Sequence, residues 1–555
     1  MGLYMAQKQI DVAGHNVSNT NTVGYSRQRY VSSAVDPKGY LQHIAPIGRG
    51  QVGGGVASLS LDQIRDKFLD VQYRTESSKS AYWSSRAGTM YYVEDIFNGI
   101  NDTSLDAVIS HFFNAVQELS KNPTDEAIRT NLVSQSKKMI DAFHMYHDQL
   151  TSLMEQQNSN MVQEAKHINE LLDRLVNLND NIKRFEVGGN VANDLRDERN
   201  LILDKLSSYM DITYTEVSYD PPVFNIHGLE LTYLQVYAGY NVGSDYEDML
   251  LVSHKTPRYL YYGDPSLEIA ESGETGLNEL ADSNDPPVVT HRLRLASNDE
   301  MLELNPNWED LNPHGMEFTS VDFSREEIEG LQNGILLNYF DLRDGRGEAF
   351  EERQGIPYFI TQLNVMVNAL VGAFNEIHMN GWTMPFVNPN GSSDSVVGRN
   401  FFDPDGVTAA TIALDLEIAV SAFNIAASSE PVTMDADGHW QTGNNENALD
   451  MFGFLKENRD EFLQAYDIAT FEGFFKNFLG NLASEVSLAN NMRDAQDILI
   501  SSIDKQRAAV MSVSEDEEMT DLIRFQHAYN AAARTITVMD EALDKLINGT
   551  GRVGL

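Results

Sequence analysis

The longest periodic stretch of the chain runs from Thr124 to Phe185 and reads TDEAIRTNLVSQSKKMIDAFHMYHDQLTSLMEQQNSNMVQEAKHINELLDRLVNLNDNIKRF. Its apolar and aromatic residues recur at spacings of three and four, which is typical of a helix that buries one stripe. On this stripe, all positions but Ser136, Gln157 and Glu164 are apolar or aromatic. The pattern predicts a long, coiled-coil-like helix that begins after Asn122-Pro123.

The stripe is interrupted near its middle. Two spacings of four follow each other around Gln157, within the polar run from Glu155 to Asn160. Such a stutter locally unwinds a supercoil or marks a break in a helix. We therefore expect a change in packing or a helix end at this point.

Both ends of the chain carry further helical stripes. The N-terminal stripe consists of Leu3, Ala6, Ile10, Ala13 and Val17. The C-terminal stripe consists of Met519, Leu522, Tyr529, Ala533, Ile536, Leu543 and Ile547. Ser514 and Glu517 form a candidate capping box for the second helix, and Asn548-Gly549 provides its end. Because a helix as short as the first is marginal alone, the two are expected to pack together.

The remaining sequence divides into helical and alternating stretches. Helical spacing covers residues 62–97, 358–377 and 486–513. Residues 211–344 alternate between apolar and polar residues with proline and glycine between the runs, which predicts strands. Residues 388–447 indicate irregular structure with short elements.

The predicted fold is mainly α with an inserted β domain. The N- and C-terminal halves form a long antiparallel helical bundle or coiled coil, and the β-rich domain lies on the outside. Residues 1–35 and 512–555 are the terminal coiled-coil helices, residues 36–210 and 345–511 the helical body, and residues 211–344 the β-rich insertion.

Composition excludes several classes of function. The 555 residues include 82 acidic and 40 basic side chains, a net charge of −42, which repels nucleic acid and acidic membrane surfaces. No apolar run reaches the length of a membrane span, so no membrane insertion is expected. The absence of cysteine excludes disulfides and cysteine-based metal or catalytic sites. The N-terminus lacks the pattern of a secretory signal, which fits a cytoplasmic protein or export by a route that reads no such peptide.

The candidate catalytic and binding motifs are weak. Residues 48–53, GRGQVG, match a dinucleotide-binding pattern, but more glycine follows where a helix should begin. His144 and His147 could share a metal ion, yet a solvated helix face is favoured. Residues 403–406 and 435–438 begin like calcium loops without the later ligands, which favours turns. No catalytic residue, metal ligand or cofactor is therefore predicted, and an assembly protein is favoured over an enzyme.

Residues 14–28, GHNVSNTNTVGYSRQ, resemble the N-terminal signature of the family of flagellar rod, hook and hook-associated proteins. The ending at residues 25–28 is most similar to the hook-associated members. Four more segments resemble the same members, in the same order: residues 112–120 with 122–125, 334–344, 425–429 and 517–549.

The resemblance implies a structural subunit of the bacterial flagellum, outside the cell at the junction of hook and filament. Its terminal helices would pair as an inner coiled coil along the axis, with the long helices around them and the β insertion facing outward. Export would use the flagellar type III system. The implied partners are further copies in a helical ring, the hook protein, a second junction protein next to flagellin, and an export chaperone.

The resemblance also assigns residues to these contacts. The expected axial packing residues are Leu3, Ile10, Val17, Leu522, Tyr529, Ile536 and Leu543, and the residues expected to shape the signature turn are Asn16, Asn19, Gly24 and Tyr25. Both terminal helices are expected to be disordered in the free monomer and to fold on assembly. Family members usually carry further residues before a Gly-Leu pair such as Gly2-Leu3, so the chain is expected to start late.

Three alternatives remain open from the sequence. Another axial subunit, such as a rod, hook or second junction protein, is the nearest; the long helix and the chain length disfavour the rod and hook proteins. A secreted coiled-coil adhesin or effector does not explain residues 14–28. An enzyme within the β insertion would need a cleft with acidic or histidine residues.

Overall fold

The computed structural model of the chain describes residues 1–35, 55–97, 104–219, 221–226, 229–238, 250–252, 259–263, 292–296, 332–347, 353–387, 393–435, 437, 440, 442–454 and 471–549. Its helices are α1 (Gly2–Ser18), α2 (Lys67–Phe97), α3 (Leu105–Lys121), α4 (Glu126–Val187), α5 (Asn193–Tyr209), α10 (Ile335–Asp344), α11 (Ile356–Met379), α12 (Leu416–Val420), the 3-10 helix η3 (Ala422–Asn424), α13 (Glu446–Gly453), α15 (Phe471–Met511) and α16 (Glu515–Gly549). Its strands are β1 (Gln28–Ala34), β2 (Val56–Gln63), β3 (Ile212–Ser218), β4 (Thr232–Ala238), β5 (Leu250–Val252), β6 (Tyr259–Gly263), β7 (Arg292–Ala296), β8 (Phe386–Val387) and β9 (Ser393–Asp394). The prediction of a mainly helical protein is confirmed.

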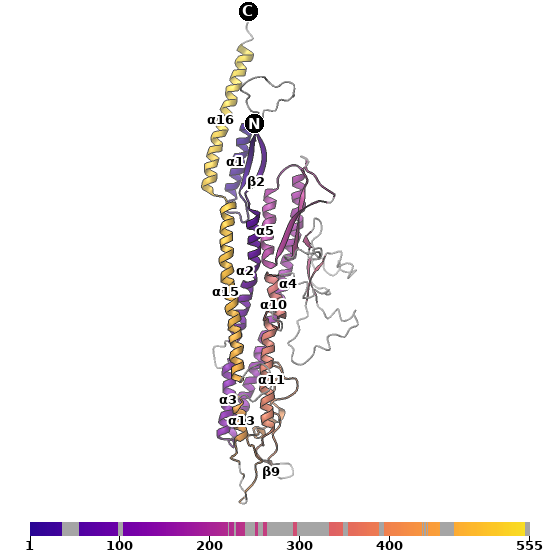
Figure 1. The fold of residues 1–555 in the computed structure, drawn as a ribbon, viewed down its shortest axis with the longest axis vertical. Helices are drawn as coiled ribbons and strands as arrows, with labels where there is room; N and C mark the ends of the chain where they lie inside the picture. The colour runs from indigo at the N-terminus through magenta and orange to yellow at the C-terminus, as the bar shows by residue number, and fades with distance from the viewer. Residues whose placement is uncertain are drawn as a thin grey trace, which may run out of the picture.

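The long helices run along the axis of an elongated molecule (Figure 1). The helices α1 and α16 lie side by side at one end, and α3 and α13 lie at the other end. The helices α2 and α15 pack in opposite directions, because Asp70, Ser80 and Arg86 contact Arg507, Asp497 and Glu485 in turn. Segments far apart in the chain therefore form one rod.

The helix α4 is continuous through the predicted stutter. It begins at Glu126, with the Asp125 carboxylate accepting from the Ala127 N–H group at 2.8 Å, and runs for 62 residues. Gln157 is 4% exposed, and its Oε1 atom has no hydrogen-bond partner in the part of the chain that the structure describes. One hydrophobic core ends at Met154 and the next begins at Met161. The stutter marks a change of packing partners, not a break.

Three predicted boundaries were wrong. The helix predicted from residue 62 begins at Lys67, because residues up to Gln63 belong to β2 and pair with β1. The helix predicted from residue 486 begins at Phe471, where Phe474, Phe475 and Phe478 enter the core. Residues 335–344 form α10 and are not β structure, because Leu336, Tyr339 and Phe340 at helical spacing pack on α4.

The strands between α5 and α10 fall where alternation was predicted. The order of one sheet is β3-β4-β5, with Ile212 opposite Ala238 and Ser218 opposite Thr232, and β6 pairs with β7. Much of residues 211–344 lies outside the described residues, so the β-rich outer domain stays a prediction. The glycine motif at 48–53 lies outside them as well.

The helix α11 is long and apolar enough to cross a membrane by length and composition alone. In the fold it is a core helix, because 61% of its apolar window is buried inside the protein. Its residues Phe359, Leu363, Leu370 and Phe374 belong to the main hydrophobic core.

A buried arginine joins the start of α4 to residues 425–429. Arg129 is 1% exposed, and its guanidinium donates to the carbonyl groups of Pro123 at 2.7 Å and Ile425 at 2.8 Å. Burial lowers the pKa of Arg129 to about 10. Because charged groups buried without such acceptors are costly, these carbonyls hold two distant segments together.

The neighbouring His378 is fully buried and neutral. Its Nε2 atom accepts from the Ala426 N–H group at 2.8 Å, so its Nδ1–H group must donate to the Arg399 carbonyl. Burial lowers the pKa of His378 to about 4, with a smaller lowering from the Arg129 charge. Protonation of Nε2 would displace the Ala426 N–H group.

We expect His378 to make the protein less stable as pH falls from about 6.5 to about 4. Above the unfolded-state pKa of about 6.5, His378 is neutral in both states and its contribution to the free energy of unfolding is complete. Below that pH the contribution is lost, because the unfolded state binds a proton that the folded state does not. The difference in pKa corresponds to about 3 kcal/mol of unfolding free energy. Urea unfolding of the wild type and His378→Gln across this range would measure it. If the difference between the two proteins does not change with pH, this account of His378 is wrong.

Candidate assembly interface

The terminal helices form the first part of the candidate interface. On α1 the buried residues are Met5, Ala6, Ala13 and Asn16, while the predicted packing residues Leu3, Ile10 and Val17 are half-buried. On α16, Leu522 and Tyr529 are half-buried, and Ile536 and Leu543 are each 55% exposed. The helices α1 and α16 are in contact, and the first five predicted residues are half-buried on them, while the last two are exposed.

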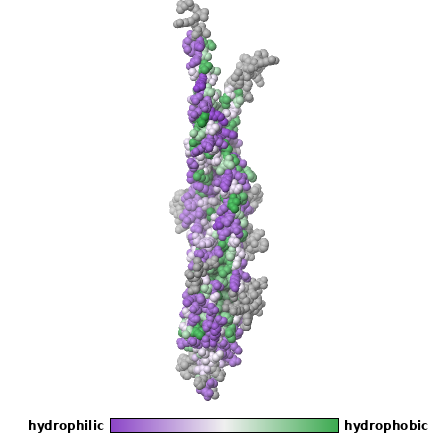
Figure 2. Space-filling view, turned by 90° about the vertical axis from the view of Figure 1, so that its left-hand side faces the viewer, coloured by the Kyte–Doolittle hydropathy of each residue, from purple (hydrophilic) through white to green (hydrophobic). Residues whose placement is uncertain are grey.

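The second half of α16 has no cover within the described chain. Every residue from Arg534 to Asn548 is exposed. An apolar stripe continues there at helical spacing through Ile536, Met539, Leu543 and Ile547. In Figure 2 hydrophobic and hydrophilic residues stand together along this projecting end. An exposed apolar stripe of this length is typical of a surface that another chain covers.

Asn16 holds the turn that follows α1. Its Nδ2–H group donates to the Gln28 carbonyl at 2.9 Å, and its Oδ1 atom accepts from the Gln28 N–H group at 3.0 Å and from the Tyr25 hydroxyl at 2.8 Å. The side chain is 1% exposed. Burial and the nearby Asp194 and Asp197 carboxylates raise the pKa of Tyr25, which keeps the hydroxyl a donor.

Asn19 and Gly24 shape the same turn. The Asn19 side chain donates to the His15 carbonyl at 3.0 Å and accepts from the Thr22 hydroxyl at 3.1 Å. Gly24 has φ of 82°, and a Cβ atom there would lie 3.2 Å from the Leu201 side chain. Only glycine meets both demands at low cost.

Ser26 fixes the segment after the turn to α5. Its N–H group donates to Asp197 Oδ2 at 2.9 Å and its hydroxyl to Oδ1 at 2.6 Å. Burial raises the pKa of Asp197, and the two Ser26 hydrogen bonds and the Arg65 charge oppose that rise. The adjacent Gln28 side chain donates to Asp194 Oδ1 at 2.7 Å, which adds a second bond to α5.

Arg27 fixes the joint between α15 and α16. Its N–H group donates to the Met511 carbonyl at 2.9 Å, at the last residue of α15. Its guanidinium contacts Glu518 at 2.6 Å and Glu517 at 2.8 Å, in the first turn of α16. Burial lowers the pKa of Arg27, but the charges and hydrogen bonds of Glu518 and Glu517 raise it by more, so the pKa is raised overall. The angle between body and terminal helices is thereby set.

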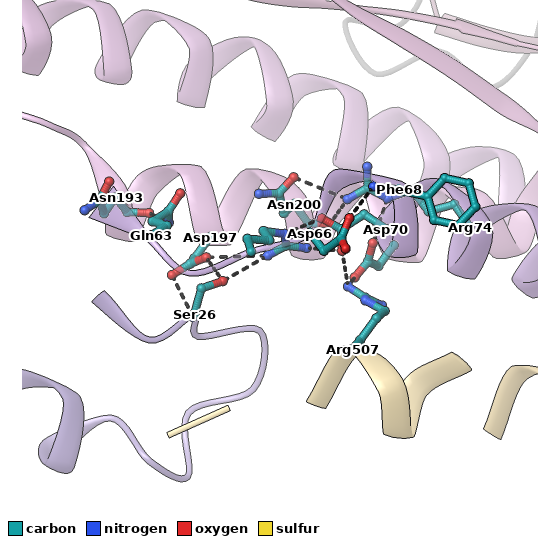
Figure 3. A network of polar contacts seen from close by, with 12 residues as sticks. Ser26, Gln63, Asp66, Phe68, Asp70, Arg74, Asn193, Asp197, Asn200 and Arg507 are labelled. Carbon is teal, nitrogen blue, oxygen red and sulfur yellow. Dashed lines mark hydrogen bonds and ion pairs between the residues drawn. The ribbon is translucent and has the colours of Figure 1, made fainter. Parts of the chain in front are cut away.

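A network of buried charges connects this segment to the body. Arg65 contacts Asp70 at 2.5 Å and Asp197 at 3.5 Å, and Arg507 contacts Asp70 at 3.1 Å and Asp204 at 2.7 Å. Figure 3 shows Arg507 reaching from α15 toward Asp70 on α2, with Ser26 and Asp197 to the left of this contact. Three helices, α2, α5 and α15, and the segment between β2 and α2 therefore meet in one set of paired charges.

Sequence reasoning missed most of this network. Asp70, Asp197, Asp204 and Arg507 come from positions that span more than four hundred residues, and each looks like an ordinary surface charge. Only residues 25–28 carried a local signal, through their likeness to the family signature. Within the described residues no group of three or more His, Asp or Glu side chains could hold a metal ion.

The structure also places the residues of the weak motifs. His144 Nε2 lies 3.0 Å from the Ile412 carbonyl, and His147 lies 3.6 Å from the Asp148 carboxylate. Asp405 and Asp437 each donate a backbone N–H group to the aspartate two residues earlier, which is the geometry of a turn. The prediction of a turn is confirmed at residues 403–406, whereas residues 436 and 438 of the second motif lie outside the described residues.

Comparison with known proteins supports one family. Residues 90–228 match the model of the flagellar hook-associated protein FlgK helical domain, and residues 511–549 match that of the flagellar basal body rod FlgEFG protein C-terminal region. The chain is 28% identical to flagellar hook-associated protein 1 of Bacillus subtilis (98% of this chain, 96% of that protein). It is 23% identical to the protein of the same name from Escherichia coli (99% and 98%).

A solved structure shares the fold. The flagellar hook junction protein FlgK from Burkholderia pseudomallei aligns with a TM-score of 0.53 at 11% identity. The alignment covers 80% of this chain and 100% of that one. This similarity supports the long helical architecture.

Proposed function

We propose that the chain, which belongs to the family of flagellar hook-associated proteins, joins the flagellar hook to the filament as an adaptor subunit. Family membership gives it a structural role in the bacterial flagellum, in an assembly with hook and filament components. The observation that carries the proposal is the uncovered apolar stripe of α16. The start of α16 is held to the body by the ion pair of Arg27 with Glu518, next to the hydrogen bonds of Ser26 to Asp197.

In this proposal, copies of the chain form a helical ring. The axial packing residues Leu3, Ile10, Val17, Leu522, Tyr529, Ile536 and Leu543 line its inner wall, because two of them are exposed and the others remain partly so. Residues 1–35 and 512–555 act as the terminal unit, residues 36–210 and 345–511 as the body, and residues 211–344 as an outward-facing β-rich part. The terminal helices gain their full order only in the ring.

The proposal also covers partners and route. One end of the ring binds the hook protein, and the other binds a second junction protein next to flagellin. The chain is exported by the flagellar type III system with the help of a chaperone, is located outside the cell, and has no catalytic activity. The hook lattice and the filament lattice are then joined by packed protein–protein interfaces on the two sides of the ring.

Replacement of Leu543 by Asp tests the assembly role. Because Leu543 is exposed in the monomer, we expect the free energy of unfolding to change by less than about 0.5 kcal/mol. Burial of a carboxylate against neighbouring copies would be costly, so bacteria that carry only this variant should have hooks without filaments. Electron microscopy and motility assays of cells that lack the wild-type protein and express only the variant would show the absence of filaments.

The matched control is Asn530→Asp, which adds the same charge to an exposed position on the opposite side of α16. It should support normal filaments. Normal filaments with Leu543→Asp as well would exclude the α16 stripe as the assembly contact.

A further inference from the structure

A groove of about 810 Å³ lies on the side of the body, away from the terminal helices. It is formed by the last turns of α2 and by the first half of α4, from Asp141 to Gln156. Tyr92, Ile96 and Met145 provide apolar walls, and Asp95, Asp141 and Asp148 stand around them. A concave site with apolar walls and a few convergent polar groups has the make-up of a binding site.

Two of the three carboxylates in the groove have no partner among the described residues. Asp95 and Asp141 have no ion pair or hydrogen bond within the described part of the chain, and Asp148 lies 3.6 Å from His147. No lysine or arginine is among the lining residues, and the lining His144 is engaged by the Ile412 carbonyl. Three carboxylates around one concave surface in a chain of charge −42 produce a negative field that favours a cation.

One wall of the groove is the exposed ring of Tyr92, which is in contact with the neighbouring Tyr91 ring. Tyr91 is 60% and Tyr92 61% exposed, and the two rings meet edge to face with centroids 6.1 Å apart. At the end of the same helix, Phe97 stacks on Tyr146 of α4 in the main core, with centroids 5.5 Å apart. Tyrosine is enriched at the energetic centres of interfaces, and a rigid base lowers the entropy cost of binding.

We propose that this groove binds a basic segment of a neighbouring protein through an inserted lysine or arginine side chain. The aliphatic stem of that side chain packs on Ile96 and Met145, and its cationic end lies between Tyr92 and the carboxylates of Asp141 and Asp148. A long side chain with an apolar stem and a charged end matches both parts of the lining. The inference rests on the proposed function, because it names the chemistry of one lateral contact in the assembly.

Photo-cross-linking in purified flagella tests the groove. A photoreactive amino acid at Met145 should cross-link to a peptide with lysine or arginine within a few residues, as identified by mass spectrometry. Asp141→Lys should reduce the yield roughly tenfold, because it places a second cation in the groove. The control Glu170→Lys makes the same change of charge at an exposed position of α4 outside the groove and should leave the yield unchanged.

A second photoreactive position, at Leu543, distinguishes failure of the groove inference from failure of the proposed function. If Leu543 cross-links and Met145 does not, or if Met145 reaches only segments without lysine or arginine, the groove inference is overturned and the proposed function stands. An unchanged Met145 yield with Asp141→Lys also overturns it. If neither position cross-links to a flagellar protein, the proposed function itself fails. The identified peptide shows whether the partner is a second copy or another protein.

Discussion

Replacement of Asp70 by Ala should lower the free energy of unfolding by about 3 kcal/mol. Asp70 is 3% exposed and is the shared partner of Arg65 and Arg507, whose side chains are 9% and 7% exposed. Removal of one partner from a buried ion pair costs roughly 3–5 kcal/mol, because the other charge stays buried. The lower end applies here, since Arg507 keeps Asp204 and Arg65 keeps a longer contact with Asp197.

Urea unfolding would measure the loss, with Asp62→Ala as the control. Asp62 is exposed on β2 and its removal should change the free energy of unfolding by less than about 0.5 kcal/mol. The double variant Asp70→Ala with Arg507→Met should recover part of the loss, because it removes one of the two stranded cations. A double variant that is less stable by the sum of both single changes would contradict the shared-partner account.

The effect should extend to assembly. Asp70 lies on α2, Arg507 on α15 and Arg65 next to the signature segment, so their charges tie the body to the turn that aims α16. A loss of about 3 kcal/mol is a large share of the stability of an ordinary domain. Stability of the body and orientation of the terminal helices are therefore coupled through the same carboxylate.

The helix α4 could be predicted because its signal is local. Its period of three and four places Leu150, Met161 and Leu175 on one buried stripe, and the stutter at Gln157 separates two cores. The helix α5 was missed for the opposite reason. Its contact surface includes the buried Asp197 and Arg199, whose partners lie elsewhere in the chain, so its sequence looks like a polar surface segment.

The candidate site was predictable only in part. The family-like segment 14–28 identified Asn16 and Tyr25, which the structure joins by a hydrogen bond of 2.8 Å. The helical stripe that contains Ile536 and Leu543 could be found from the sequence. Its exposure could not, because a helical stripe alone cannot tell a contact within the chain from one with a neighbouring chain. The side groove could not be predicted, since Asp95 and Asp141 come together only when α2 packs on α4.

Replacement of Gly334 by Ala should lower the free energy of unfolding by at least about 3 kcal/mol. Gly334 has φ of 103°, and a Cβ atom there would lie 2.4 Å from the Tyr209 carbonyl oxygen and 2.7 Å from Met210 Cα. These are backbone atoms at the end of α5, so the start of α10 must move and Leu336 must leave its core.

Gly372→Ala is the matched control for this change. Gly372 lies within α11, and a Cβ atom there would meet nothing within 4 Å, so alanine should stabilise the helix by roughly 0.5–1 kcal/mol. The same substitution should therefore act in opposite directions at the two sites, as measured by urea unfolding. A Gly334→Ala protein as stable as the wild type would mean that the α5–α10 contact can shift without loss of packing. In that case the close approach of Gly334 to the backbone of Tyr209 and Met210 would not be the reason why residues 334–344 resemble the family.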